Sequence, residues 1–266
     1  MTEKEFVQWQ VDEYNKAVGN LNESDGYDCV ICKNKGFTSM VKYNEFIKSH
    51  FETLVPCKCA RIRSAIKRLN RSGLKNIVKD YTFDNYKCET AWQDNVKFYA
   101  MRFCKDNENN WFFIGGQSGA GKTHLCTAIA VHYIRTGKEM RYMLWRDEIS
   151  RIKASMNDDA GDMIKELKET QVLYIDDLFK MGKDEDGRVK MPTASDVNIA
   201  FEILNYRLLN PELITIISSE RTLVELNQID EAIAGRIAEK TKDAGYCLNI
   251  KKDPSRNWRM KGIQEV

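Results

Sequence analysis

Residues 116–123 read Gly116-Gln117-Ser118-Gly119-Ala120-Gly121-Lys122-Thr123, and they fit the pattern G-x-x-x-x-G-K-[ST] in full. The segment stands between an apolar run, 111–114, and a helical pattern, 122–135. Glycines allow successive backbone N–H groups to turn inward around a phosphate, and the following helix adds its positive N-terminal end. We therefore expect a phosphate-binding loop for ATP, with Lys122 on the β- and γ-phosphates and the Thr123 hydroxyl on Mg²⁺.

Apolar runs alternate with helical patterns from about residue 87 onward. The runs are continuously apolar rather than alternating, which is typical of strands that are covered on both faces. This order predicts an α/β fold with a parallel sheet between two layers of helices. The expected strands are 111–114, 142–145, 172–175, 213–217 and 246–250. The expected helices are 98–103, 122–135, 149–169 with a break near Gly161, 196–209 and 232–240.

Polar residues follow two of these strands. Asp176 and Asp177 come directly after 172–175, where a carboxylate would hold Mg²⁺ directly or through water, and a second one would polarise the attacking water. Ser218 and Ser219 end the next run. We expect Ser219 to sense the γ-phosphate or to orient the water, and a simple turn at the end of the strand is an equally good interpretation.

Arg236 lies on the expected helix 232–240, after the fourth strand. One interpretation is an arginine finger that enters the site of a neighbouring subunit. The other is a surface salt bridge. The sequence alone leaves both open.

Four of the eight cysteines are paired near the N-terminus, Cys29 with Cys32 and Cys57 with Cys59, with 24 residues between the pairs. Two thiolate pairs suit tetrahedral Zn²⁺, so we expect one zinc ion here, and His50 is a candidate ligand if one cysteine does not bind. A metal would also hold together a segment with few apolar residues. Four unrelated cysteines and a redox pair at Cys29 and Cys32 are the alternatives. A short helix over 5–18 is expected before this segment, and irregular chain over 19–60.

The 266 residues carry a net charge of only +2, so the chain as a whole is no polycation. Residues 56–79, in contrast, contain basic side chains and no acidic ones: Lys58, Arg61, Arg63, Lys67, Arg68, Arg71, Lys75 and Lys79. We expect a basic helix over about 60–72 that faces phosphate groups or an acidic partner; a solvated helix face is the alternative. The sequence contains no apolar run of transmembrane length and no export signal, so we expect a cytoplasmic protein.

The phosphate loop with His124, the strand end at Asp176 and Asp177, the strand end at Ser219 and the helix with Arg236 together resemble AAA+ ATPases of the DnaC/DnaI helicase-loader group. The resemblance covers about residues 73–260. It implies a three-layer α/β ATPase with a reduced lid, and an N-terminal zinc domain that contacts the replicative helicase. It places residues 81–85, with Phe83, near the adenine, and His124 among the nucleotide-binding residues. Arg259 resembles a late arginine of the family whose role stays open.

The resemblance predicts an ATP-dependent loader that places a replicative DNA helicase on single-stranded DNA in bacterial or phage replication. The expected domains are a zinc-binding module over 1–60, a basic helix and linker over 61–80, and an AAA+ ATPase over 81–266. ATP, Mg²⁺ and Zn²⁺ are the expected cofactors, and self-association or assembly on the helicase ring is expected. The family usually has Glu at position 177 and Asn at 219, so slow or partner-stimulated hydrolysis is predicted. A transposition-helper ATPase and an ATP-bound adaptor with little hydrolysis are the alternatives, and a small-molecule kinase is disfavoured.

Overall fold

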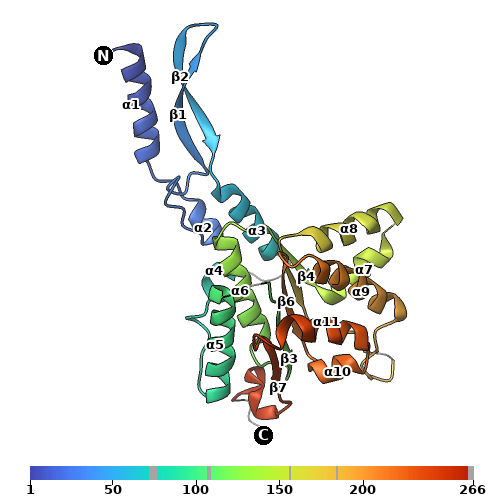
Figure 1. The fold of residues 1–266 in the computed structure, drawn as a ribbon. Helices are drawn as coiled ribbons and strands as arrows, with labels where there is room; N and C mark the ends of the chain where they lie inside the picture. Colours follow the sequence, from blue (N-terminus) through green and yellow to red (C-terminus); the bar gives the residue numbers. More distant parts are fainter. Residues whose placement is uncertain (72–76, 107–108, 156, 184, 263–266) are drawn as a thin grey trace. The chain divides into compact units, whose positions relative to one another are not determined.

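The computed structural model describes residues 1–71, 77–106, 109–155, 157–183 and 185–262. The chain forms two compact units, Met1–Lys79 and Asp80–Val266 (Figure 1). None of the helices in the described ranges has the length and hydrophobicity needed to cross a bilayer.

The first unit contains a helix packed on a β-hairpin. Helix α1 (Glu3–Lys16) starts with a capping box, in which Thr2 and Glu5 each accept a hydrogen bond from the backbone N–H of the other. It buries Val7 and Val11 on its inner side and packs against both strands of the hairpin. The remaining elements are β1 (Phe37–Asn44), β2 (Ser49–Pro56) and the helices α2 (Leu21–Asp25), α3 (Cys59–Arg71) and α4 (Ile77–Asp80).

The hairpin corrects the expectation of irregular chain over 19–60. Strands β1 and β2 pair antiparallel over their full length, from Phe37 opposite Pro56 to Asn44 opposite Ser49. Charged and polar residues interrupt both strands, so neither forms the apolar run that marks the strands of the second unit. Their stability comes instead from the ladder and from α1, whose Asn15 side chain exchanges two hydrogen bonds, 2.9 and 3.0 Å long, with the backbone of Ser39.

The second unit is built on a five-stranded sheet in the order β4-β5-β6-β3-β7, and all four pairs of neighbouring strands are parallel. The strands are β3 (Phe112–Gly116), β4 (Met140–Leu144), β5 (Val172–Asp176), β6 (Ile214–Ser219) and β7 (Cys247–Ile250). The predicted α/β fold with a parallel sheet is therefore confirmed, including all five strands.

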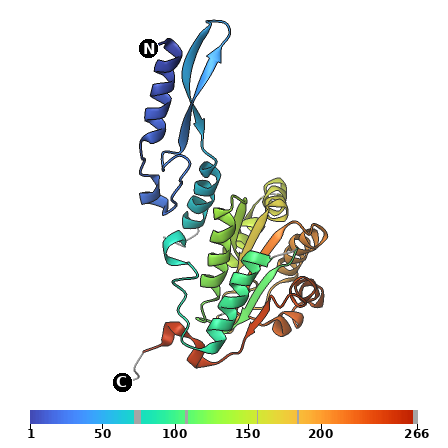
Figure 2. The same cartoon turned by 60° about the vertical axis from the view of Figure 1, so that its left-hand side comes forward.

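Helices cover both faces of this sheet (Figures 1 and 2). On one side α6 (Lys122–Arg135) lies on the central strands and α5 (Ala91–Asp106) packs beside it. The other face is covered by α7 (Trp145–Ala154), α8 (Asn157–Glu169), α9 (Ala194–Leu209) and α11 (Glu231–Thr241), with the short α10 (Leu223–Asn227) against α11. Short 3₁₀ turns, Pro254–Arg256 and Trp258–Met260, follow the last strand.

The helix expected over 149–169 is two helices, α7 and α8, and the break lies near Ser155 instead of Gly161. The N–H of Ser155 bonds to the carbonyls of Arg151 and Ile152, which closes α7. Gly161 lies inside α8, and apart from its own stretch of helix no described atom lies within 4 Å of the position its Cβ would take. A glycine on an open helix surface lowers helix propensity without ending the helix.

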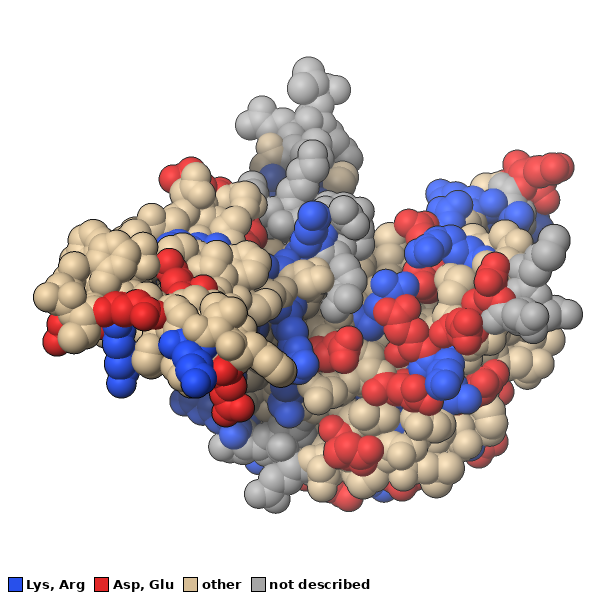
Figure 3. Space-filling view, turned by 90° about the horizontal axis from the view of Figure 1, so that it is seen from above, with Lys and Arg blue, Asp and Glu red and all other residues tan. Residues whose placement is uncertain are grey.

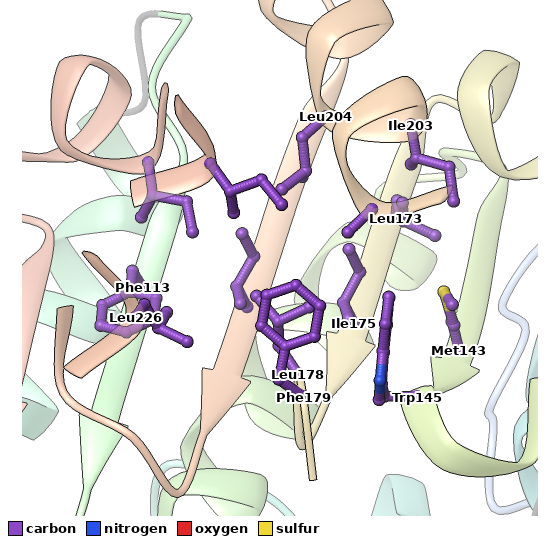
Figure 4. Close-up of a cluster of buried hydrophobic side chains, with 14 of the residues drawn as sticks. Phe113, Met143, Trp145, Leu173, Ile175, Leu178, Phe179, Ile203, Leu204 and Leu226 are labelled. Carbon is purple, nitrogen blue, oxygen red and sulfur yellow. The ribbon is translucent and has the colours of Figure 1, made fainter. Parts of the chain in front are cut away.

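Alternation of side chains along the strands divides the core between the two faces. Figure 4 shows the face toward α7, α9 and α11, where Met143, Leu173 and Ile175 lie near Trp145 and the α9 residue Ile203, and Phe113 lies beside Leu226. The alternate residues Phe112, Ile114, Tyr174 and Ile216 are also fully buried. Burial on both faces explains why the strands are continuously apolar in the sequence.

One buried cation joins three elements of the second unit. Arg207 on α9 is fully buried, and its Nε donates to Oγ1 of Thr215, 2.8 Å away on β6. Its other nitrogens donate to the backbone carbonyls of Leu167, Lys168, Thr170 and Ile214. These contacts hold the C-terminal end of α8 and the start of β6 to α9, and they compensate for the burial of the charge.

We predict that Arg207→Leu lowers the free energy of unfolding by about 3 kcal/mol or more, because five buried or partly buried acceptors lose their donor. Urea unfolding of the full chain measures this. The control is Arg151→Ala, which removes an ion pair of a side chain that is 65% exposed. It should cost less than about 1 kcal/mol. Equal midpoints for the two variants would contradict the assigned role.

Candidate nucleotide-binding site and metal centre

The phosphate loop connects the end of β3 to the start of α6, at the carboxyl edge of the sheet. Gly116 and Gly121 both adopt positive φ angles, 111° and 81°. A Cβ on Gly116 would lie 2.0 Å from the carbonyl oxygen of Ile250, and one on Gly121 would lie 2.7 Å from the ring of Tyr86. The loop conformation and its close neighbours thus require glycine at both positions.

Lys122 lies inside this loop. Its Nζ donates to the carbonyl oxygens of Gly116 and Gln117 at 3.0 and 2.7 Å, and the residue is 6% exposed. Burial lowers the pKa of Lys122, and the nearby carboxylates of Asp177 and Glu220 act in the opposite direction. An ammonium group has three donors, so one remains for a phosphate oxygen.

The structure brings together the two residues that we predicted to hold Mg²⁺. Oγ1 of Thr123 donates to Oδ1 of Asp176 at 3.2 Å. The same carboxylate accepts hydrogen bonds from the hydroxyls of Ser218 and of Tyr142, the latter at 3.0 Å to Oδ2. Burial raises the pKa of Asp176. Oxygen ligands of this kind suit Mg²⁺, and these two residues fit the ion. Tyr142 was not predicted, because a tyrosine within an apolar strand gives no sign of its hydrogen bond.

Asp177 and the loop belong to one network of charges. Oδ2 of Asp177 accepts a hydrogen bond from Nζ of Lys180 at 2.8 Å. Lys180 also lies 3.0 Å from Oε1 of Glu220, and that oxygen accepts a hydrogen bond from the Ser118 hydroxyl at 3.0 Å. Sequence reasoning missed the pairing of Lys180 with Glu220, because an ion pair between residues that follow two different strands depends on the order of the strands in the sheet.

The hydroxyl of Ser219 forms hydrogen bonds with the backbone of the two turns that follow β5 and β6. Its Oγ donates to the carbonyl of Leu178 at 2.8 Å and accepts from the N–H of Arg221 at 3.1 Å, and the residue is fully buried. Ser218 is the serine that contacts Asp176. These contacts favour the turn interpretation, and the role of Ser219 toward a γ-phosphate stays a prediction.

Segment 81–86 lies against the start of α6. Nε2 of His124 is 2.8 Å from the carbonyl oxygen of Thr82, and burial lowers the pKa of this histidine. The ring of Tyr86 packs against His124 and below Gly121, and its buried hydroxyl has no partner within the described residues. Phe83, which we predicted near the adenine, is half-buried in the same segment. The structure thus adds Tyr86 to the residues around the loop.

Residues after β7 also lie on the phosphate loop. The N–H of Gln117 donates to the carbonyl of Ile250, and Oε1 of Gln117 accepts from the N–H of Asp253 at 3.0 Å. The N–H of Trp258 donates to the carbonyl of Gly119 at 3.0 Å. The neighbouring Arg259 is exposed. The C-terminal segment therefore belongs to the surroundings of the site.

Arg236 contacts residues of its own chain. Nε and Nη2 donate to Oδ1 of Asn205 at 3.1 and 2.8 Å, and the guanidinium carbon lies 4.1 Å from the centre of the Phe201 ring. It forms hydrogen bonds and a cation–π contact with α9, which differ from the surface salt bridge of the alternative interpretation. Its role as a finger stays a prediction.

The four paired cysteines converge in the first unit. Their Sγ atoms all lie within 4.8 Å of one another, and all four residues are buried. The contacts from Cys29 to Cys57 and from Cys32 to Cys59 are 3.7 and 3.6 Å. Four thiolates around one zinc at about 2.3 Å would place their sulfurs about 3.8 Å apart, so the geometry fits zinc. Disulfides would require about 2 Å.

The cluster also decides between the alternatives for these cysteines. Cys29 and Cys32 each contact a thiol of the second pair, so the four side chains form one site instead of an isolated redox pair. His50 is not part of the cluster; its ring packs against Tyr43 in the hairpin. With all four cysteines in the cluster, His50 is not needed as a substitute ligand.

We predict about one zinc ion per purified chain. Elemental analysis measures this, and less than about 0.2 zinc per chain without chelator would contradict it. Cys32→Ser should lose most of the metal, because a hydroxyl is a poorer zinc ligand than a thiolate. Cys88→Ser, a change outside the cluster, should keep it.

We predict that Lys122→Ala lowers ATP affinity at least about tenfold, because it removes the buried charge that faces the phosphates. Binding of a fluorescent ATP analogue measures this, and circular dichroism checks the fold. Lys138→Ala changes an exposed lysine just after α6 and should bind like the parent. If Lys122→Ala bound ATP as the parent does, the phosphate-loop assignment would be wrong.

Comparison with known proteins shows to which family the chain belongs. The family model described as "IstB-like ATP binding protein" matches residues 35–260. The phage-like element PBSX protein XkdC of Bacillus subtilis (strain 168) is 31% identical over 258 residues, which cover 91% of this chain and 90% of XkdC. The replicative helicase loader DnaC of Buchnera aphidicola subsp. Acyrthosiphon pisum (strain APS) is 31% identical over 116 residues, 41% of this chain and 47% of the loader.

Among solved structures, the crystal structure of the DnaI superimposes with a TM-score of 0.49 and 20% sequence identity, covering 69% of this chain and 93% of that one. The alignments thus extend over most of XkdC and over about half the length of the DnaC loader. The family match includes the phosphate loop, the strand end at Asp176 and the second cysteine pair, Cys57 and Cys59, whereas Cys29 and Cys32 lie before it. The chain belongs to the IstB/DnaC-like family of AAA+ ATPases, the IstB-like ATP binding proteins.

Proposed function

We propose that this protein hydrolyses ATP to load a replicative DNA helicase onto single-stranded DNA. The proposal of ATP hydrolysis is supported by three features that lie close together at one edge of the sheet. Lys122 lies inside the phosphate loop, Thr123 is hydrogen-bonded to Asp176, and Asp177 is the next residue along the chain. The assignment to helicase loading is supported by the sequence similarity to proteins named replicative helicase loader DnaC.

In the proposed reaction, a water molecule attacks the γ-phosphorus and the bond to the β–γ bridging oxygen breaks, which leaves ADP and phosphate. Asp177 accepts the proton of the attacking water, and Lys122 compensates for the charge on the transferred group. Thr123 and Asp176 would hold Mg²⁺, which when bound would supply positive charge to the phosphates. Asp177 is shorter than the glutamate that is usual here, so we expect slow or partner-stimulated turnover.

The zinc-binding unit is the proposed contact to the helicase, and α3 is the proposed contact to single-stranded DNA. Ile62, Ala65 and Ile66 form the buried side of α3, while Arg61 and Lys67 are exposed. Arg63, however, forms an ion pair within the first unit. Its side chain is 11% exposed and its Nη1 donates to Oδ1 of Asp25 at 2.6 Å.

The proposed DNA contact therefore rests on Lys58, Arg61 and Lys67, without Arg63. Lys75 and the side chains of Arg68 and Arg71, which also belong to the predicted basic stretch, lie outside what the structure describes. The net charge of the chain is only +2, and acidic and basic side chains are interspersed on the face shown in Figure 3. Binding of single-stranded DNA would therefore depend on a local group of basic side chains and not on the charge of the whole chain.

Assembly on the helicase ring is part of the proposal. Arg236 would then enter the site of a neighbouring subunit, which requires it to leave Asn205 and Phe201 of its own chain. Such a finger stabilises the charge that develops on the γ-phosphate. Turnover should accordingly rise with protein concentration or with a helicase template.

We predict that the purified full chain binds the replicative helicase of its source cell and increases helicase-dependent unwinding of a forked DNA in the presence of ATP. Lys122→Ala should still bind the helicase but fail to support loading. Cys32→Ser should lose helicase binding, because the zinc unit makes the contact, and Cys88→Ser is its control.

The alternatives predict other results. Capture of a transposase without the helicase would indicate a transposition helper. Helicase binding with no ATP turnover, with or without single-stranded DNA, would indicate an ATP-bound adaptor. Either result would contradict the proposed loader.

A further inference from the structure

The ion pairs of Lys180 form a bridge beside the phosphate loop. Nζ of Lys180 lies 2.8 Å from Oδ2 of Asp177 and 3.0 Å from Oε1 of Glu220. Without this cation, two carboxylates would lie next to a loop that binds a polyanion. Both hydrogen bonds raise the pKa of Lys180 against the lowering effect of burial, so the amine stays charged at neutral pH.

The position of Lys180 relative to the phosphates follows from a shared atom. Oε1 of Glu220 is bonded both to Lys180 and to the hydroxyl of Ser118, the third residue of the loop, each at 3.0 Å. The charges of Asp177, Glu220 and Lys180 all act on the ammonium group of Lys122. Lys180 is thus a second cation beside the phosphate loop, in addition to Lys122, and it comes from the same chain.

The backbone that carries Lys180 is held in an unusual conformation. Asp177 and Phe179 both have φ of 58°, in the left-handed region that residues other than glycine rarely adopt. The turn is fixed by hydrogen bonds from the Leu178 N–H to the Ser218 carbonyl and from the Lys180 N–H to the Asp177 carbonyl, 2.8 and 2.9 Å long. Backbone strain of this kind is found most often at functional sites.

Buried side chains anchor this turn in the core. Leu178 and Phe179 are 0% and 1% exposed, and the ring of Phe179 packs edge-on against Trp145 with 5.1 Å between the ring centres (Figure 4). The side chain of Lys180, in contrast, is 38% exposed. The backbone at Lys180 is therefore fixed, while its ammonium group can exchange one partner for another.

We propose that Lys180 binds the terminal phosphate of ATP and that this contact releases Asp177 from its ion pair. The inference rests on the proposed ATPase function. The γ-phosphate carries more negative charge than a carboxylate and offers several acceptor oxygens, so it competes with Asp177 for the ammonium group. ADP lacks this group and leaves the ion pair intact. Lys180 thus distinguishes ATP from ADP, and Asp177 becomes available for the attacking water only when ATP is bound.

The test compares the affinities of the full chain for a non-hydrolysable ATP analogue and for ADP, both with Mg²⁺. Lys180→Met should reduce the preference for the ATP analogue about tenfold, the factor expected for one charge-assisted hydrogen bond, and should change ADP affinity much less. Lys180→Arg keeps the charge and should restore most of the preference. Lys168→Met is the matched control, since Lys168 also forms an ion pair, with Glu202 at 3.1 Å, and should bind both nucleotides like the parent.

The possible results separate this inference from the function on which it rests. If the parent bound neither nucleotide, the proposed ATPase function itself would fail. If the parent bound both and Lys180→Met kept the parent's preference for the ATP analogue, only the role of Lys180 would be overturned. An equal loss of affinity for both nucleotides would also overturn it, because Lys180 would then act through the general charge of the site.

Discussion

The buried carboxylate of Asp176 is the group on which the arrangement of the site depends. It accepts hydrogen bonds from Thr123 on α6, Ser218 on β6 and Tyr142 on β4, and thus connects the phosphate-loop helix to three strands of the sheet. A carboxylate at this depth is tolerated only with such donors or with a cation. The parallel sheet makes this possible, because the carboxyl ends of its strands meet at one edge.

The two units are stabilised in different ways. The second has an extensive apolar core on both faces of its sheet, and the loop residues are positioned by that core. The first consists of a hairpin and a few helices, α1 and α3 being the longest, and large apolar side chains such as Trp9 and Phe46 are exposed. A unit with so little buried apolar surface gains little stability from packing. A metal bound by the four converging thiols would hold its segments together instead.

The sequence predicted those features that depend on local patterns. The five strands were found because burial on both faces makes them continuously apolar, and the phosphate loop because its glycines are required by backbone geometry. The cysteine pairs were found from their spacing. The hairpin over 37–56 was missed, because its strands are stabilised by each other and by α1. Glu220, Tyr142 and Tyr86 were missed as well, and so was the pairing of Lys180 with Glu220, because these contacts arise only when distant segments meet in the folded chain.

The central claim is that residues 116–123 and Asp176 form a site for a magnesium–nucleoside triphosphate complex. Isothermal titration of the parent protein with ATP, in Mg²⁺ and again in excess EDTA, tests it most directly. The account predicts one ATP bound per chain, with clearly weaker binding in EDTA and no binding of adenosine at the same concentration. Equal affinity for ATP and adenosine, or no binding of ATP in the presence of Mg²⁺, would contradict it.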